Sequence, residues 1–208
     1  MAEGDLVLTP GWTWHEHVHR GKKPIIWLDG LNSPLHRYLG TAAFEPGPIR
    51  ELPPMIPDAA FVVPSIIPET GKGQSEHSPV FHYAYDKAAA ALSAAPLGRD
   101  GSRRVRYVNP TNGGNAIALL DLQLVQLDAD VTTIPFRTSA NAICAVVEGT
   151  GETRVGDQNF RWGPKDVFTL PQGNWIVHRA SERARLFVYS DKEVFARLGL
   201  LKEEYDNA

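Results

Sequence analysis

The chain has 208 residues, of which 43% are hydrophobic and 22% charged, and its formal net charge is −3. A chain of this length and composition can bury a real core, and the slightly acidic balance argues against a nucleic-acid partner, which usually requires a basic surface. No stretch reaches the roughly 18 apolar residues of a membrane span, and residues 1–10 lack the basic and apolar regions of a signal peptide. We therefore expect a globular protein with neither a nucleic-acid nor a membrane partner.

Most of the predicted elements are strands, because short segments rich in Val, Ile, Leu, Phe and Thr alternate with Gly, Asp and Pro. The predicted strands are 5–9, 24–30, 104–109, 116–127, 141–148, 151–155, 166–170, 174–179 and 184–190. EGTGE at 148–152 and VGDQN at 155–159 have the composition of hairpin turns. This pattern of many short strands predicts a β-sandwich or a β-barrel.

Two helices are expected. DKAAAALSAA, at 86–95, begins with an aspartate that can cap a helix and continues with strong helix formers. DKEVFARLGLLKEEYDN, at 191–207, is amphipathic, since Phe195, Leu198 and Leu201 recur at helical spacing.

A proline-rich region separates the two ends of the chain. Seven prolines lie between residues 45 and 68, and proline fixes φ and removes a backbone donor, so no regular helix or strand is expected there. The expected organisation is an N-terminal piece at 1–44, a proline-rich linker with a short helix at 45–103, a β domain at 104–190 and a C-terminal helix at 191–208.

An internal repeat relates the start of the chain to its last third. GDLVLTPGWTWHEH at 4–17 is similar to PKDVFTLPQGNWIVH at 164–178. Four identical pairs are each separated by 161 positions: Asp5 and Asp166, Pro10 and Pro171, Trp14 and Trp175, His17 and His178. The repeat predicts two copies of one structural unit. The counterpart of 136–149 in the first copy would precede residue 1, so the first copy is expected to lack its front half.

The single cysteine, Cys144, excludes an intrachain disulfide. It lies in the apolar segment NAICAVVEG and is interpreted as a small core residue rather than a nucleophile. Without disulfides or a visible signal peptide, a cytoplasmic location is expected.

Three histidines, His15, His17 and His19, occupy alternate positions in HEHVH. In a strand, residues two apart point to one face and are separated by about 6.6 Å along the backbone. Imidazoles that converge from neighbouring strands can share a metal ion. The pattern thus suggests a metal site but does not by itself supply the remaining ligands.

The segment at 4–17, followed by PIIWLDGLNSPL at 24–35, resembles the gentisate 1,2-dioxygenase family. These are bicupin, non-haem iron enzymes that open aromatic rings, and they include salicylate and 1-hydroxy-2-naphthoate dioxygenases. The similarity continues in SPVFHYAYDKAAAAL (78–92), RYVNPTNGGNA (106–116), AVVEGTGETRVGD (145–157) and RWGPKDVF (161–168). It implies a mainly β fold made of cupins, which are jelly rolls, with an incomplete first cupin at 1–44 and a complete second cupin at 104–190.

The resemblance also implies roles for individual residues. In the family three histidines hold Fe(II), two of them from an H-x-H motif early in the first cupin and the third at the position of His15. The H-x-H partners would precede residue 1, so the site is expected to be incomplete on this chain. His17 and Asp29 match residues that face the substrate, and Trp14 and Trp27 would wall an aromatic pocket. His19 is expected to lie in a solvated loop.

The second cupin is expected to hold no metal. Phe136, Thr138 and Ile176 occupy the three positions that correspond to iron ligands, and none of these side chains is a ligand. His178 remains as a single histidine and is interpreted as structural.

The reaction implied by the resemblance is Fe(II)-dependent insertion of O2 into an aromatic hydroxy acid, converting gentisate to maleylpyruvate in a homo-oligomer. The 208-residue chain alone is expected to be inactive. Two alternatives stay open at this point: a non-catalytic cupin scaffold or a subunit completed by a separate N-terminal half, and a zinc or nickel site at HEHVH without dioxygen chemistry. The sequence does not distinguish gentisate from salicylate or a hydroxynaphthoate as the substrate.

Overall fold

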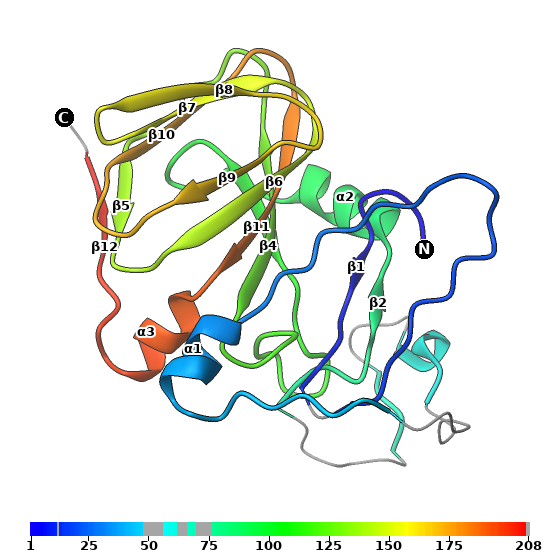
Figure 1. Cartoon of the computed structure of the whole chain (residues 1–208). Coiled ribbons are helices and arrows are strands. Elements are labelled where there is room, and N and C mark those ends of the chain that lie inside the picture. The colour runs from blue at the N-terminus through cyan, green and yellow to red at the C-terminus, as the bar shows by residue number, and fades with distance from the viewer. Residues whose placement is uncertain (12, 48–55, 62–65, 70–75, 207–208) are drawn as a thin grey trace.

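The computed structural model describes residues 1–11, 13–47, 56–61, 66–69 and 76–206, and its main body consists of two antiparallel five-stranded sheets (Figure 1). One sheet has the strand order β3-β4-β11-β6-β9 and the other β12-β5-β10-β7-β8. The strands are β3 Arg103–Arg106, β4 Asp121–Leu127, β5 Phe136–Thr138, β6 Ala142–Glu148, β7 Gly151–Val155, β8 Gln158–Trp162, β9 Val167–Leu170, β10 Ile176–Ala180, β11 Ala184–Ser190 and β12 Glu203–Tyr205. This is the mainly β sandwich that the strand pattern predicts and the jelly roll that the resemblance implies.

The core between the sheets is built from alternate residues of strands on both sides. One buried cluster joins Leu127 of β4, Val146 of β6 and Leu186 of β11 to Trp162 of β8 and Ala180 of β10. Along β10 the exposure of the side chains alternates, as expected for a strand with one face in the core. Burial of these apolar side chains supplies the main stabilisation of the sandwich.

The predicted turn at 155–159 is confirmed, whereas the predicted hairpin at 148–152 is wrong. Val155 of β7 pairs with Gln158 of β8, so two residues, Gly156 and Asp157, close a tight hairpin. By contrast, β6 and β7 belong to different sheets, and the chain passes from one sheet to the other at Gly149, which has a φ of +84°. Glycine suits both kinds of turn, so composition does not distinguish them.

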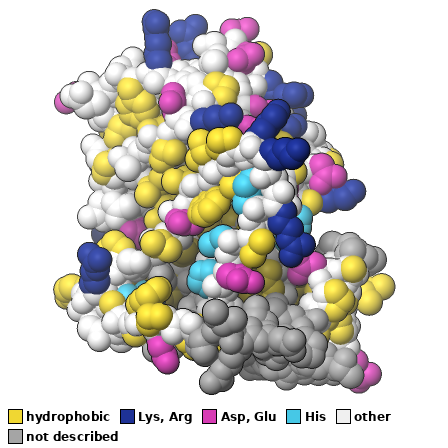
Figure 2. All heavy atoms as spheres, turned by 45° about the vertical axis from the view of Figure 1, so that its right-hand side comes forward, with side chains coloured by type: hydrophobic (Ala, Val, Ile, Leu, Met, Phe, Trp, Pro, Cys, Tyr) yellow, Lys and Arg dark blue, Asp and Glu magenta, His cyan; other side chains and the backbone are white. Residues whose placement is uncertain are grey.

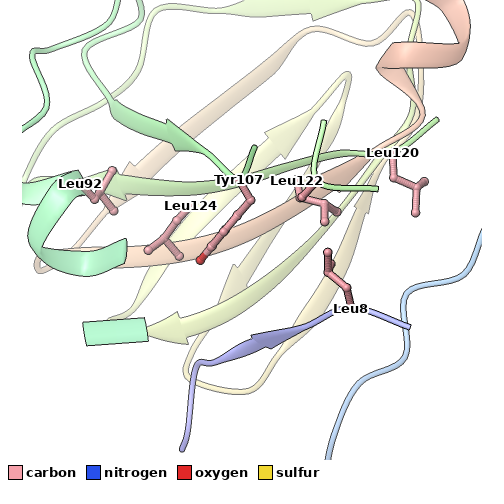
Figure 3. Packing of buried hydrophobic residues seen from close by; sticks show 7 residues of the cluster. Leu8, Leu92, Tyr107, Leu120, Leu122 and Leu124 are labelled. Carbon is pink, nitrogen blue, oxygen red and sulfur yellow. The ribbon is translucent and has the colours of Figure 1, made fainter. Parts of the chain in front are cut away.

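The N-terminal segment is attached to the first of these sheets. Its strand β1 (Leu6–Val7) pairs with β2 (His82–Tyr83), and Leu8 is buried against Tyr107 and Leu122 in a cluster that also contains Leu92 of the helix α2 (Figure 3). α2 runs from Tyr85 to Ala94, within one residue of the predicted helix at 86–95. The N-terminal piece is therefore part of the same folded body as the β-sandwich.

The helix predicted over 191–207, and with it the assignment of 191–208 as a C-terminal helix, is wrong in extent. The helix α3 covers only Lys192–Arg197, and Gly199, with a φ of +69°, follows its end. The chain then forms β12, which pairs with β5 and places the ring of Tyr205 against that of Phe136, with 4.9 Å between centroids and 45° between the ring planes. The apolar spacing that suggests a longer helix does not mark a buried face, since Leu198 is 66% exposed.

The strand predicted at 24–30 is also absent: residues 13–32 form neither helix nor strand in the structure. A helix that the sequence pattern did not reveal, α1 (Ser33–Tyr38), follows it and has Pro34 in its first turn, where proline is well tolerated. A short 3-10 helix, η1, covers Asp58–Phe61. No helix among the residues placed in the structure is long and apolar enough to cross a membrane.

Candidate functional site

A buried hydrogen-bond network around His178 lies in the interior of the complete cupin. The side-chain oxygen of Thr153 lies 2.8 Å from Nδ1 of His178 and accepts a hydrogen bond of 2.8 Å from Nε1 of Trp162. Because that Trp–Thr bond uses the threonine oxygen as acceptor, its own proton is free to be donated to Nδ1 of His178. All three side chains are buried. These contacts agree with a structural role for His178.

The positions aligned with iron ligands in this cupin are close together but non-ligating. Phe136 of β5 pairs directly with Ile176 of β10, and Thr138 lies two residues along β5. Cys144, also in this barrel, is fully buried, and burial raises the pKa of its thiol to about 12. A thiol with so high a pKa is a poor nucleophile, which supports its interpretation as a core residue.

Because the pKa of His178 is lowered in the folded protein, the free energy of unfolding is expected to depend on pH. Burial lowers the pKa of His178 to about 4 from an ordinary 6.5, and the nearby Arg104 acts in the same direction. As the pH falls, His178 therefore takes up a proton at a higher pH in the unfolded chain than in the folded chain. We expect the contribution of His178 to be fully present above pH 6.5 and to be lost as the pH falls from 6.5 towards 4, at up to about 1.4 kcal/mol per pH unit.

Urea unfolding at pH 7.5, 6 and 5 measures this dependence. The variant His178→Gln lacks the titrating group and should show a shallower fall in the free energy of unfolding over the same range. An equal fall in both proteins would mean that other groups cause the acid sensitivity.

The N-terminal histidines lie in a different setting, on the extended segment between β1 and α1. The rings of His15 and His17 are 5.7 Å apart, centroid to centroid, and His17 stacks on Trp27 at 5.0 Å with 22° between the ring planes. All three side chains are exposed. The structure thus brings together three of the five residues expected at the site.

The neighbour of His15 determines which of its nitrogens is available. Nδ1 of His15 lies 3.3 Å from the carbonyl oxygen of Thr13, which can only accept a hydrogen bond. A hydrogen bond to this oxygen requires the proton on Nδ1 and leaves Nε2 as the nitrogen that can bind a metal ion in the neutral ring.

The other two expected residues are placed less directly. Asp29 is exposed and lies two residues beyond Trp27, whose ring stacks on that of His17. Trp14 lies against Gly47, where an added Cβ would be 3.0 Å from its ring, rather than against the histidines. Of the two tryptophans, Trp27 is therefore the one that lies against the histidines.

Tyr189 of β11 holds the end of this extended segment and was not identified from the sequence. Its hydroxyl donates a hydrogen bond of 3.1 Å to the carbonyl of Leu31, and Gly30 approaches the same ring. His19 has a local role, since its Nε2 lies 2.6 Å from the carbonyl of Lys23 and closes the bend between the two legs. This agrees with its expected place in a loop.

The described part of the chain does not contain a complete metal site. No group of three or more His, Cys, Asp or Glu side chains in it is placed to hold a metal ion. His15 offers one suitable nitrogen, so a three-histidine iron site does not fit the described residues alone. Any metal bound at His15 would need ligands from elsewhere.

Comparison with known proteins relates nearly the whole chain to ring-cleaving dioxygenases. No family model matches the chain. It is 33% identical over 211 residues to gentisate 1,2 dioxygenase 1 of Aquipseudomonas alcaligenes, covering 98% of this chain and 60% of the relative. It is 34% identical to the 5-aminosalicylate 1,2-dioxygenase of Comamonas sp, covering 98% of this chain and 56% of the relative.

The same relationship holds in three dimensions. A crystal structure of the salicylate 1,2-dioxygenase from Pseudaminobacter salicylatoxidans, as an adduct with gentisate, matches with a TM-score of 0.92 and 26% identity. The match covers 100% of this chain and 61% of that one. The chain therefore spans about 60% of the length of the proteins that it matches.

Proposed function

We propose that this chain, a homologue of the gentisate 1,2-dioxygenases over nearly its whole length, carries part of the active site of an oxygenase that opens an aromatic ring. The observation that carries the proposal is the 33% identity to a gentisate 1,2-dioxygenase across 98% of the chain. The names of the relatives include gentisate, 5-aminosalicylate and 1-hydroxy-2-naphthoate as substrates. These compounds share a carboxylate next to a ring hydroxyl, so an aromatic ortho-hydroxy acid is the proposed substrate class.

The roles proposed for the residues follow from their chemistry and placement. His15, with Nε2 unprotonated, supplies one ligand to Fe(II), the metal expected from the resemblance. The ring of His17 is oriented by its stack on Trp27 and can form a hydrogen bond with a substrate oxygen. Asp29, two residues beyond Trp27, can accept the proton of a hydroxyl or orient an imidazole. The exposed part of Trp27 offers an apolar surface to the ring of the substrate.

The proposed domain organisation keeps an incomplete first cupin at 1–44 and a complete, metal-free second cupin at 104–190, joined by 45–103. The two five-stranded sheets, which lie between Arg103 and Tyr205, support the second of these units. In this organisation the second cupin acts as a scaffold that anchors the histidine segment through Tyr189. A homo-oligomeric state and a cytoplasmic location stay predictions.

The test is oxygen consumption by iron-loaded protein. The 208-residue chain is loaded with Fe(II) under nitrogen and then given gentisate and air. It is tested alone and co-expressed with the part of the Aquipseudomonas alcaligenes relative that it does not cover. We expect no turnover from the chain alone, and iron binding with gentisate-dependent oxygen uptake from the complemented protein.

Two results would contradict the proposal. Turnover by the chain alone would show that it builds a site from ligands other than those proposed. A complemented protein that binds iron but consumes no oxygen with gentisate, salicylate or 1-hydroxy-2-naphthoate would instead favour a non-catalytic cupin scaffold. Behind that alternative is the expectation that the first cupin lacks two of its three ligands, together with the non-ligating Phe136, Thr138 and Ile176 at the aligned positions of the second cupin.

A further inference from the structure

A pocket of about 360 Å³ lies between the helices α1 and α3, which are neighbours in Figure 1. It is lined by Leu35 of α1 and by Val194 and Phe195 of α3. Its wall also includes Ile143 of β6 and Tyr189 of β11, which are paired directly across the two strands, so their side chains lie on one face of the sheet. This volume is at the lower end of the range for small-molecule sites.

Enclosure, rather than exposure, distinguishes this pocket. Figure 2 shows that hydrophobic side chains are exposed at many points on one face of the molecule, so exposure alone does not identify a ligand site. In the pocket, Ile143, Val194 and Phe195 are half-buried, and Leu120 is 7% exposed. A ligand there would contact apolar side chains from both helices and from the sheet, which is the arrangement typical of small-molecule sites.

One charged side chain, Asp191, lies on the wall of this mainly apolar pocket. Its carboxylate is held by Asn141, whose backbone N–H donates to Oδ1 at 2.7 Å and whose Nδ2 donates to Oδ2 at 2.9 Å. A carboxylate can accept about four hydrogen bonds, so each oxygen keeps a free acceptor position. The adjacent Lys192 is paired with Glu203 at 2.8 Å, and no lysine or arginine in the described part of the chain forms an ion pair with Asp191. The carboxylate is therefore fixed in place and has no cationic partner among the described residues.

A leucine with strained backbone lies on the same wall. Leu119 lines the pocket and has a φ of +66°. This left-handed conformation is uncommon for a residue with a Cβ, whereas a glycine adopts it without strain. Strained residues of this kind cluster at ligand sites. The leucine places an apolar side chain at the pocket, where a glycine would place none.

The lining residues determine the class of ligand. Their apolar side chains favour a hydrocarbon or aromatic body, and the fixed carboxylate of Asp191 favours a cationic donor. A primary ammonium group provides three donors and no acceptor. A carboxylic acid, such as the aromatic hydroxy acids of the proposed function, would instead place a like charge beside Asp191. The pocket is therefore suited to a compound of a different class.

We propose that the pocket between α1 and α3 is a binding site for a small primary amine. The apolar body of the amine lies among Leu35, Ile143 and Phe195, and its ammonium group binds the carboxylate of Asp191. This inference goes beyond the proposed function and does not depend on it.

The pocket is nevertheless in contact with the extended segment between β1 and α1. Tyr189 lines the pocket, and its hydroxyl donates a hydrogen bond of 3.1 Å to the carbonyl of Leu31, which lines the pocket as well. A bound amine thus packs against the residue that anchors this segment.

Isothermal titration calorimetry of the 208-residue chain with 2-phenylethylamine tests the site. We expect one-to-one binding with a dissociation constant below about 1 mM. Phenylacetate carries an anionic end on a ring of the same size, and 2-phenylethanol carries an uncharged one. Both should bind at least about tenfold more weakly, because hydrogen bonds between two charged groups are the strongest. No saturable binding of the amine, or equal binding of all three compounds, would overturn the proposal.

Two substitutions locate the binding. Asp191→Asn removes the charge at nearly constant shape and should weaken amine binding at least about tenfold, with a smaller effect on 2-phenylethanol. Val194→Trp fills part of the pocket and should weaken the binding of both compounds, which keeps the proposal testable if Asp191→Asn does not fold. The matched control is Asp157→Asn, which removes an exposed carboxylate from the turn between β7 and β8 and should leave binding unchanged. Full affinity in Asp191→Asn, or an equal loss in the control, would contradict the assigned site.

Amide NMR spectra recorded during the same titration show which residues the amine contacts. The largest shifts are expected at residues 34–35, 142–143 and 189–195. Larger shifts elsewhere would place the amine at another site and overturn the proposal. Sedimentation of the same samples tests a second occupant. A dimer in which these amides shift with protein concentration before any amine is added would show that a second copy of the chain covers the pocket, which would also overturn it.

Discussion

Replacing His15 with alanine in the complemented protein is expected to abolish iron binding and to lower gentisate-dependent oxygen uptake at least about a hundredfold. Loss of a residue that only supports a metal ligand already costs 10- to 100-fold in affinity or activity, so loss of the ligand itself should cost more. Nδ1 of His15 lies 3.3 Å from the carbonyl oxygen of Thr13, which leaves Nε2 as the nitrogen proposed to bind the metal. Bound iron and initial rates of oxygen uptake are measured on the same preparation.

His19→Ala is the control for this variant. His19 lies four residues away on the same segment and is also exposed, and its Nε2 lies 2.6 Å from the carbonyl oxygen of Lys23. It should keep both iron and activity. If His15→Ala retains stoichiometric iron and full turnover, His15 is not a ligand and the proposed site is wrong.

Replacing Gly149 with alanine is expected to lower the free energy of unfolding by about 3 to 5 kcal/mol, the largest stability effect that we predict. Gly149 has a φ of +84°, where a residue with a Cβ is strained. The added Cβ would also lie 2.5 Å from the carbonyl oxygen of Arg183 and 2.6 Å from Cα of Ala184. These are backbone atoms at the start of β11, and Ala184 is paired with Leu127 of β4, so the clash cannot be relieved by rotating a side chain.

The variant Gly173→Ala separates the effect of the positive φ from the effect of the clash with the backbone. Gly173 has a φ of +77°, and an added Cβ there would meet nothing within 4 Å. It should therefore show the conformational strain alone, about 1 kcal/mol. Urea unfolding of the two variants gives the cost of the clash as the difference between them. Equal destabilisation would show that the contact with β11 is relieved by movement of the backbone.

The internal repeat shows that tertiary contacts give matching residues different roles in the two copies. His17 and His178 occupy matching positions in the two copies, as do Trp14 and Trp175. His178 is buried and bonded to Thr153 inside a closed sandwich, whereas His17 is exposed on an open face and stacks on a tryptophan. The difference arises because His178 lies on β10 within a paired sheet, whereas His17 lies in the segment 13–32, which forms no strand.

Much of the second cupin could be predicted from the sequence. The strands at 151–155 and 184–190 begin and end as predicted, because their residues alternate or run apolar between clear turn signals. The helix at 86–95 and the hairpin at 155–159 follow in the same way from local propensity. The spacing and the family resemblance point to His15 and His17 as site residues, and only the structure shows that they lie beside Trp27; their roles stay predictions.

Only the tertiary structure decided which segments pair. It places β6 and β7 in different sheets, turns the expected end of the last helix into β12 beside β5, and leaves 24–30 without a strand. It also reveals Tyr189 as the anchor of the histidine segment, across 158 residues of sequence. The physical reason is common to all four. A strand is defined by a partner that can lie far away in the chain, so local composition determines which residues favour extended backbone, and long-range contacts determine whether and where that backbone is paired.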